Sequence, residues 1–234
     1  MARITHESAL VLGVTLFLGL PLAAHAALVD RGGGLIYDTD LNITWLSNAN
    51  AALGSAFDDG TNTTDGRMSW QSAVDWAASL NAGGVTGWRL PGTTVPDATC
   101  SDPTHGYGDS CTGSEMGHLF YVELGGEPNT TILTSGDPAL LALFSNIQGT
   151  YWSGTTEPGF PDYAMTFTFT QGNQSDAFKT TNFVAGWAVH DGDVAVVPAP
   201  GAAWLLATGL LGLLERSRRR KLRDRPVLET PTSA

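Results

Sequence analysis

Three histidines outside the first 26 residues could take part in acid–base or metal chemistry: His105, His118 and His190. His118 falls on a segment expected to be helical, and Glu115 beside it resembles half of a zinc-binding pair. A glutamate at the start of a helix is also explained by its favourable interaction with the helix dipole. We therefore prefer a surface or structural role for His118, and a metal-dependent hydrolase using Glu115 and His118 stays an alternative.

Carboxylates are frequent, and one group has the spacing of a calcium loop. Asp38, Asp40 and Asn42 alternate as at the start of an EF-hand loop, but Ile43 stands where that loop needs glycine. Ala49 stands where it needs the bidentate glutamate. We expect solvated turn residues here, with calcium as an open alternative.

Motifs of the common catalytic classes are missing from the sequence. It contains neither the Gly-x-Ser-x-Gly of a nucleophile elbow nor the Gly-x-x-x-x-Gly-Lys of a phosphate loop. The remaining carboxylate neighbours, Asp58/Asp59 and Asp191/Asp193, fall in expected turns, where such side chains are normally solvated. We expect no catalytic residues, no cofactor-binding residues and no metal ligands, and a protein that is not an enzyme.

The chain has two cysteines, Cys100 and Cys111, which flank a short loop rich in Gly, Asp and Ser. In an exported chain an even pair this close in sequence is most simply a disulfide. Two free thiols are the alternative, whereas a metal site lacks a convincing set of further ligands.

A helix is predicted within Met68–Pro91, the segment around which the rest of the chain is expected to be built. Ser69 suits its N-cap, and Gly83-Gly84 is expected to end it. Its apolar residues recur at the three-and-four spacing of one helical face: Trp70, Ala73, Val74, Ala77 and Leu80.

The other elements read as an α+β order, with a hairpin first, helices in the middle and strands last. Residues 35–37 and 43–46 predict the hairpin, and helices are expected over 114–124 and 137–147. Strands are predicted at 151–153, 163–170, 175–179 and 182–190.

Charge is distributed unevenly along the chain. Residues 27–197 hold four Lys and Arg against 19 Asp and Glu, while seven of the 12 basic residues follow residue 197. A body this acidic should repel nucleic acid and anionic polysaccharides, so no nucleic-acid partner is expected.

Residues 1–26 have the pattern of a secretory signal peptide. A weakly basic start precedes a short apolar core, and Ala24-His25-Ala26 fits the small-x-small site of signal peptidase. We expect cleavage between Ala26 and Ala27; an uncleaved anchor helix is the alternative.

Residues 198–221 have the pattern of a second targeting signal. The motif is Val197-Pro198-Ala199-Pro200, followed by an apolar run over 200–214 and by Arg218-Arg219-Arg220-Lys221. As a helix the run would be about 22 Å long, short for a hydrocarbon core of about 30 Å. This order resembles the PEP-CTERM sorting signal, which implies recognition by an exosortase, a membrane-embedded peptidase.

The sorting signal departs from the family pattern in two ways. Pro-Ala-Pro replaces Pro-Glu-Pro, and the polar tail 222–234, expected to be disordered, follows the basic cluster. A permanent C-terminal anchor with the same orientation is therefore the alternative.

The body, residues 27–197, resembles the DUF1566 family, also called the Lcl C-terminal domain. The motifs that carry the resemblance occur in family order: Gly34–Asp38, Leu41–Leu46, Ser69–Leu80, Gly87–Pro91, Ser114–Met116, Tyr151–Ser153 and Trp187–Val189. The resemblance implies a single α+β domain of the C-type-lectin-like kind, with short helices and antiparallel hairpins, and a structural role for Arg89.

Taken together, the two targeting signals and the lectin-like body predict an exported, non-enzymatic protein. It would be held in the inner membrane by the C-terminal helix and then sorted to the surface or the exopolysaccharide layer. We expect it to bind, through loops, a ligand such as neutral extracellular polysaccharide, with Tyr107, Trp152 and Tyr163 as candidate contacts. A purely structural matrix protein is the rival expectation.

Overall fold

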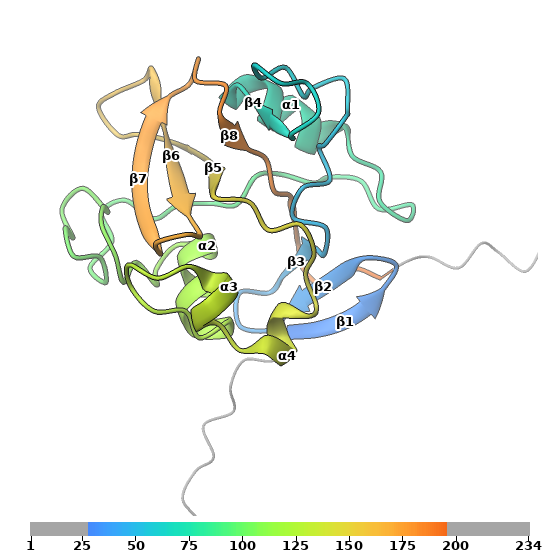
Figure 1. Ribbon diagram of the computed structural model, residues 1–234, viewed down its shortest axis with the longest axis horizontal. Helices are drawn as coiled ribbons and strands as arrows, with labels where there is room; N and C mark the ends of the chain where they lie inside the picture. The colour runs from blue at the N-terminus through green and yellow to red at the C-terminus, as the bar shows by residue number, and fades with distance from the viewer. Residues whose placement is uncertain (1–27, 196–234) are drawn as a thin grey trace, which may run out of the picture.

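The computed structural model describes residues 28–195, which form two β-sheets joined by loops and short helices (Figure 1). The α+β class is confirmed, with strands more prominent than helices. Within the described residues no helix is long and apolar enough to span a bilayer. The predicted signal peptide, its cleavage site, the sorting motif, the membrane helix and the tail lie outside the described residues.

The first sheet confirms the predicted hairpin and extends it on both sides. Its strand order is β1 (Leu28–Gly32), β2 (Leu35–Asp38), β3 (Ile43–Leu46) and β9 (Val189–Asp191), all antiparallel. Asn42 takes a φ of 52° in the turn between β2 and β3, a conformation that asparagine tolerates better than most residues.

The second sheet has five strands. Their order is β4 (Arg67–Met68), β8 (Val184–Ala185), β5 (Thr150–Thr156), β6 (Tyr163–Thr168) and β7 (Asn173–Phe178). The pair β5–β8 is parallel and the other neighbours are antiparallel. Strands β5, β6 and β7 form a long meander, and this meander borders the candidate site described in the next subsection.

The single strand predicted over 182–190 is wrong, because the chain changes sheets within it. Strand β8 belongs to the second sheet and β9 to the first, with Gly186 at the crossing. A Cβ on Gly186 would lie 3.1 Å from the Trp76 ring, so the backbone passes very close to α1 (Trp70–Ser79).

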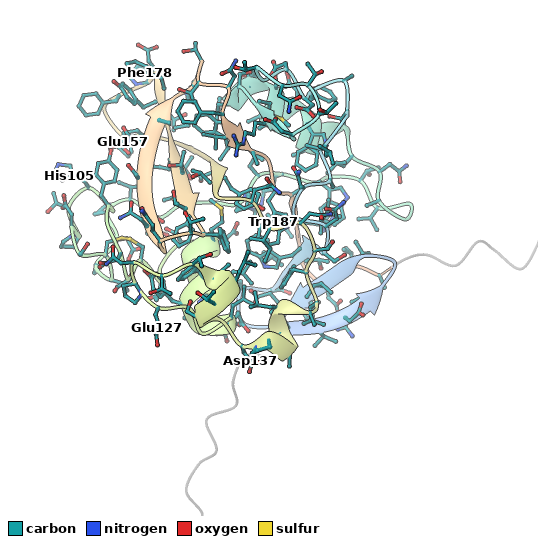
Figure 2. All side chains as sticks on the ribbon, in the orientation of Figure 1. His105, Glu127, Asp137, Glu157, Phe178 and Trp187 are labelled. Atoms are coloured by element: carbon teal, nitrogen blue, oxygen red, sulfur yellow. A yellow bond between two sulfur atoms is a disulfide. The ribbon has the colours of Figure 1, made fainter. Side chains whose placement is uncertain are left out.

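Trp187, between the two sheets, is the centre of the core (Figure 2). Its side chain is fully buried, and its indole nitrogen donates to the carbonyl of Leu46 at 2.7 Å. Four aromatic rings surround it, with centroids 5.1–5.5 Å from that of Trp187: Trp45, Phe144, Tyr151 and Phe169. This aromatic cluster joins the two sheets into one core.

The start of α1 is confirmed and its predicted end is wrong. Ser69 Oγ accepts from the backbone of Ser72, as expected of the N-cap. The helix ends at Ser79, because Ala82 and Val85 exchange two backbone hydrogen bonds and close a tight turn. Gly83 and Gly84, with φ of 63° and 89°, form that turn and do not cap the helix.

The remaining helices are single turns. They are α2 (Glu115–His118), the π-helix η1 (Leu119–Glu123), α3 (Ile132–Ser135) and α4 (Pro138–Leu141). Asp137 caps α4 as its sequence suggests, but the helix expected to reach residue 147 stops early, and Asn146 takes a φ of 58°. The first predicted helix of this region is observed as α2 and η1 together.

Candidate functional site

A cavity of about 320 Å³ lies between the disulfide loop and the β5–β7 meander. Its lining combines aromatic rings with two carboxylates and one imidazole: His105, Tyr107, Glu157, Phe160, Tyr163 and Asp176. Pockets of this size lined by aromatic groups with a few polar atoms are the usual form of a small-ligand site.

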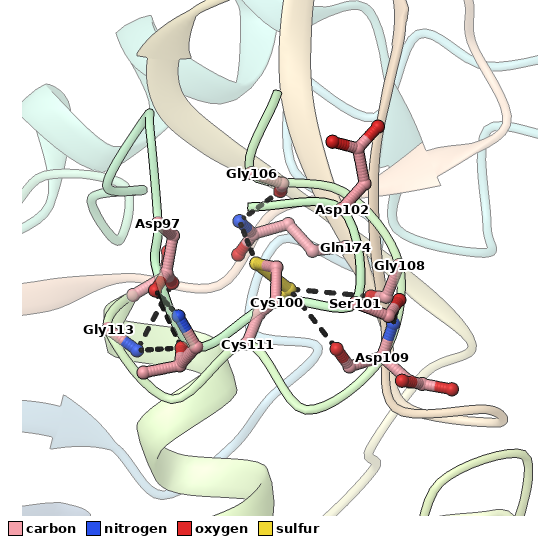
Figure 3. The surroundings of a disulfide bond; sticks show 12 residues. Asp97, Cys100, Ser101, Asp102, Gly106, Gly108, Asp109, Cys111, Gly113 and Gln174 are labelled. Atoms are coloured by element: carbon pink, nitrogen blue, oxygen red, sulfur yellow. Dashed lines mark hydrogen bonds between the residues drawn. A yellow bond between two sulfur atoms is a disulfide. The ribbon is translucent and has the colours of Figure 1, made fainter. Parts of the chain in front are cut away.

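The predicted disulfide is present (Figure 3), and the loop that it closes contributes to the lining of the cavity. Cys100 and Cys111 close the loop that carries His105 and Tyr107. Gln174 of β7 fixes this loop to the sheet, since its side-chain amide donates to Gly106 at 2.6 Å. Backbone hydrogen bonds in both directions between Gly108 and Gln174 complete the attachment.

The aromatic rings of the cavity lining form two groups, and Phe178, outside the lining, packs on one of them. The rings of His105 and Tyr107 are stacked with centroids 5.9 Å apart, and those of Tyr163 and Phe178 are 4.0 Å apart. Phe160 and Phe178 are 59% and 52% exposed, unusually high for phenylalanine. Figure 2 shows His105, Glu157 and Phe178 along the same side of the molecule.

Two carboxylates make the cavity acidic. Glu157 is only 4% exposed, and its Oε2 has no hydrogen-bond partner among the described residues. Burial raises the pKa of Glu157, and the charge of Asp176 raises it further, whereas Tyr107 and His105 lower it. The pKa of Tyr107 is also raised, mainly by burial and to a smaller extent by the negative charges of Asp176 and Glu157.

The structure brings two of the three predicted ligand contacts together and separates the third. Tyr107, in the disulfide loop, and Tyr163, on β6, both line the same cavity. Trp152, in contrast, is fully buried, and its indole nitrogen donates to the carbonyl of Met68 at 2.9 Å. Trp152 is therefore part of the core and cannot contact a ligand at the surface.

His105 was considered from the sequence for acid–base or metal chemistry only, and Glu157, Phe160 and Asp176 were not predicted as site residues. Glu157 and Asp176 belong to different strands or strand ends, and only the pairing of β5, β6 and β7 places them beside Tyr163. Residues 157–163 hold two acidic and two aromatic side chains, and this local composition is a signal that could have pointed to Phe160.

A second cavity, of about 360 Å³, lies beside α1. It is lined mainly by Trp70, Val74, Trp88 and Leu90, with Arg89 at one side. The Lys179 ammonium lies 4.1 Å from the centroid of Trp70. Arg89 and Thr155, polar side chains of its lining, are already hydrogen-bonded within the protein, to Glu115 and to Thr93.

Arg89 has the structural role that the family resemblance implies. Its guanidinium binds both carboxylate oxygens of Glu115 and also reaches Asp191 Oδ1 at 2.6 Å. The pKa of Arg89 is raised, and its hydrogen bonds to Glu115 are the largest cause. Glu115 is thus engaged by Arg89 and does not form a metal-binding pair with His118.

Two acidic residues expected to be solvated are buried. Asp38 is 0% exposed, with Oδ1 accepting from the backbone of Asp40 and Leu41, and Asp58 is 3% exposed. Asp58 Oδ2 accepts from the backbone of Gly54 and Gly66, which explains its burial. Asp38 lies in a cluster with His118 and Glu123.

Comparison with known proteins gives one match. The family model of the Lcl C-terminal domain matches residues 34–190, which include both cavities and the disulfide loop. No curated protein and no solved structure matches the chain.

Proposed function

The chain belongs to the Lcl C-terminal domain family, and we propose that it is an exported, non-enzymatic binding protein whose ligand is a neutral glycan. The observation that carries the proposal is the cavity between the disulfide loop and the β5–β7 meander, which Tyr107 and Tyr163 line together with Glu157 and Asp176. The C-type-lectin-like relationship of the fold is part of the same proposal.

The chemistry of the cavity suits a sugar ring. One face of a pyranose presents C–H groups, which pack on aromatic rings such as Tyr107 and Tyr163. The hydroxyls at its edge are hydrogen-bond donors, and the carboxylates of Glu157 and Asp176 are strong acceptors. Because both carboxylates repel anions, a neutral or amino sugar fits better than a uronic acid.

The binding test uses the full chain, an array of neutral oligosaccharides and the exopolysaccharide of the producing cells. We expect binding that Tyr163→Ala lowers at least tenfold, because stacking on that ring is lost. Phe183→Ala is the matched control, since Phe183 is 65% exposed and does not line the cavity. An array without hits would refute the glycan part of the proposal.

A structural matrix protein would behave differently in the same experiment. It would retain affinity for whole matrix, and free sugars would not compete. That result would move the proposal from a ligand-binding module to a structural component of the exopolysaccharide layer.

We further propose, from the sequence of the two ends, that the protein is exported, held in the inner membrane and released to the surface by an exosortase-type peptidase. Intact mass and fractionation from the producing cells test this. A mass that begins at Ala27 and ends near Val197–Pro200 is expected in the surface fraction. A membrane-bound chain that reaches Ala234 would instead indicate a permanent anchor.

A further inference from the structure

His118, Asp38 and Glu123 form a cluster in which one ligand atom from each lies within 4.8 Å of the others. Asp38 comes from the end of β2, whereas His118 ends α2 and Glu123 ends η1. Asp40, in the turn after β2, has Oδ2 at 3.3 Å from His118 Nε2. The cluster therefore joins the first hairpin to the helical segment.

The charges of the cluster are not balanced by the protein. Asp38 is 0% exposed and Glu123 is 4% exposed, so two carboxylates are buried, with Asp40 as a third at the surface. Even a protonated His118 would supply a single positive charge. Buried charges in proteins are normally paired or bound to metal, and a divalent cation would neutralise this excess.

Hydrogen bonding does not account for the arrangement either. Glu123 Oε1 and His118 Nε2 are both buried and have no hydrogen-bond partner among the described residues, although they are 3.4 Å apart. The Glu123 side chain is 1% exposed and its unpartnered oxygen faces the imidazole. A native protein rarely leaves two such atoms unsatisfied side by side.

The distances from His118 Nε2 to two carboxylate oxygens fit a tetrahedral metal centre. Ligand atoms about 2.0–2.1 Å from a zinc ion lie about 3.3–3.4 Å from one another at tetrahedral angles. His118 Nε2 is 3.3 Å from Asp40 Oδ2 and 3.4 Å from Glu123 Oε1. These are the edges expected of such a polyhedron, with the imidazole nitrogen at the shared corner.

The local backbone supports the same interpretation. Glu123 lies five positions after His118, and in an α-helix this spacing would turn their side chains about 140° apart. The wider π-helix η1, with Leu124 N donating to Leu119 O at 2.9 Å, brings them together on one face. Single π-turns of this kind are frequent at functional sites.

A second layer of contacts holds Asp38 in place. Its Oδ1 accepts from the backbone of Asp40 and Leu41 at 3.1 and 3.0 Å, and its Oδ2 lies 3.5 Å from the indole nitrogen of Trp45. Hydrogen bonds that orient carboxylate ligands are a regular feature of metal centres.

We propose that Asp38, Asp40, His118 and Glu123 form a structural site for a divalent transition-metal ion, zinc in the first place, that cross-links the first hairpin to the α2–η1 segment. One imidazole and three carboxylates are a ligand set that zinc accepts. Calcium requires six to eight oxygen ligands and is disfavoured by the imidazole. The proposal is independent of the glycan cavity, which shares no residue with it.

The test measures bound metal and thermal stability of the full chain, purified without chelator. We expect about one zinc per chain by mass spectrometry of metals. After removal with EDTA, zinc at 100 times its Kd should raise Tm by about 5 °C, and the same concentration of calcium should not.

Variants separate a built site from adventitious binding. Glu123→Gln should abolish the zinc-dependent rise in Tm, and Asp40→Asn should weaken zinc binding at least tenfold. Asp40 has a side chain that is 53% exposed, so its substitution leaves the metal-free fold intact. Glu127→Gln, which removes the same charge from an exposed residue nearby, should change neither property.

The proposal is overturned if the chain holds no zinc and no Tm shift follows its addition. It is equally overturned if Asp40→Asn and Glu123→Gln bind zinc as the unchanged chain does. A larger stabilisation by calcium than by zinc would refute the assignment to a transition metal.

Discussion

Arg89 and Glu115 are joined by two parallel hydrogen bonds, Nη1 to Oε2 at 2.8 Å and Nη2 to Oε1 at 2.7 Å. Glu115 Oε2 also accepts from the backbone N–H of Gly92 at 2.6 Å, and Asp191 of β9 binds the Nε and Nη2 edge of the guanidinium. The Arg89–Glu115 pair thus links α2, the loop that follows Leu90 and strand β9 of the first sheet.

Replacing Arg89 with lysine should destabilise the domain by about 2–3 kcal/mol. Lysine keeps the charge, but it cannot form the paired hydrogen bonds and leaves Glu115 partly unsatisfied. Urea unfolding measures the loss. Arg67→Lys is the control, because Arg67 is exposed on β4, and it should change the free energy of unfolding by less than about 0.5 kcal/mol.

Gly117→Ala should be strongly destabilising although alanine is the better helix former. Gly117 lies in α2 under the disulfide loop, and a Cβ there would overlap the carbonyl of Cys111. We expect a loss of more than about 3 kcal/mol in the free energy of unfolding, since backbone must move. Gly149→Ala, whose Cβ would meet only Thr170 at 3.8 Å, should be tolerated in the same assay.

Loss of the Cys100–Cys111 disulfide should weaken both stability and ligand binding. It closes a loop with a sequence separation of 11, for which about 3 kcal/mol is expected from chain entropy. The loop carries His105 and Tyr107, so glycan affinity should fall by more than the loss of folded protein explains. A Cys100→Ser/Cys111→Ser variant, with its folded fraction measured by near-UV circular dichroism, separates the two effects. Unchanged affinity per folded molecule would show that the loop does not shape the site.

Glu157 should make the stability depend on pH in a defined direction. Its folded-state pKa is raised above the ordinary value of 4.5, mainly by burial. Its contribution to stability is therefore fully present below pH 4.5 and is lost as the pH rises through the folded-state pKa.

Glu157→Gln removes the buried charge and should stabilise the domain at pH 7 by about 1–3 kcal/mol. That advantage should shrink as the pH is lowered to 4.5, as urea unfolding at several pH values would show. Glu127→Gln, at an exposed position, should give no such trend. A constant difference across the pH range would mean that Glu157 titrates normally.

Local patterns predicted the elements whose stabilising contacts are also local. Ser69 caps α1 through a hydrogen bond to a residue three positions away, and the β2–β3 hairpin pairs residues of one short segment. The disulfide was predictable because its cysteines are close in sequence and unaccompanied by other thiols.

Contacts between distant segments could not be predicted in the same way. The division of residues 182–190 between two sheets depends on partners in β4, β5 and β3. The burial of Trp152 depends on Met68, and the approach of Asp38 to His118 requires the hairpin and the helices to be packed. For these residues periodicity and composition carry no information about the partner.

Strand β9 is the last of the described strands to be synthesised, yet it completes the sheet whose other strands, β1, β2 and β3, are synthesised first. Until residues 189–191 have left the ribosome, β3 has no partner on one side, although all four of its residues are buried in the finished domain. Arg89 lacks Asp191 over the same interval. A nascent chain truncated before residue 189 should therefore expose an open, apolar strand edge, and chaperone capture during synthesis should end when these three residues emerge.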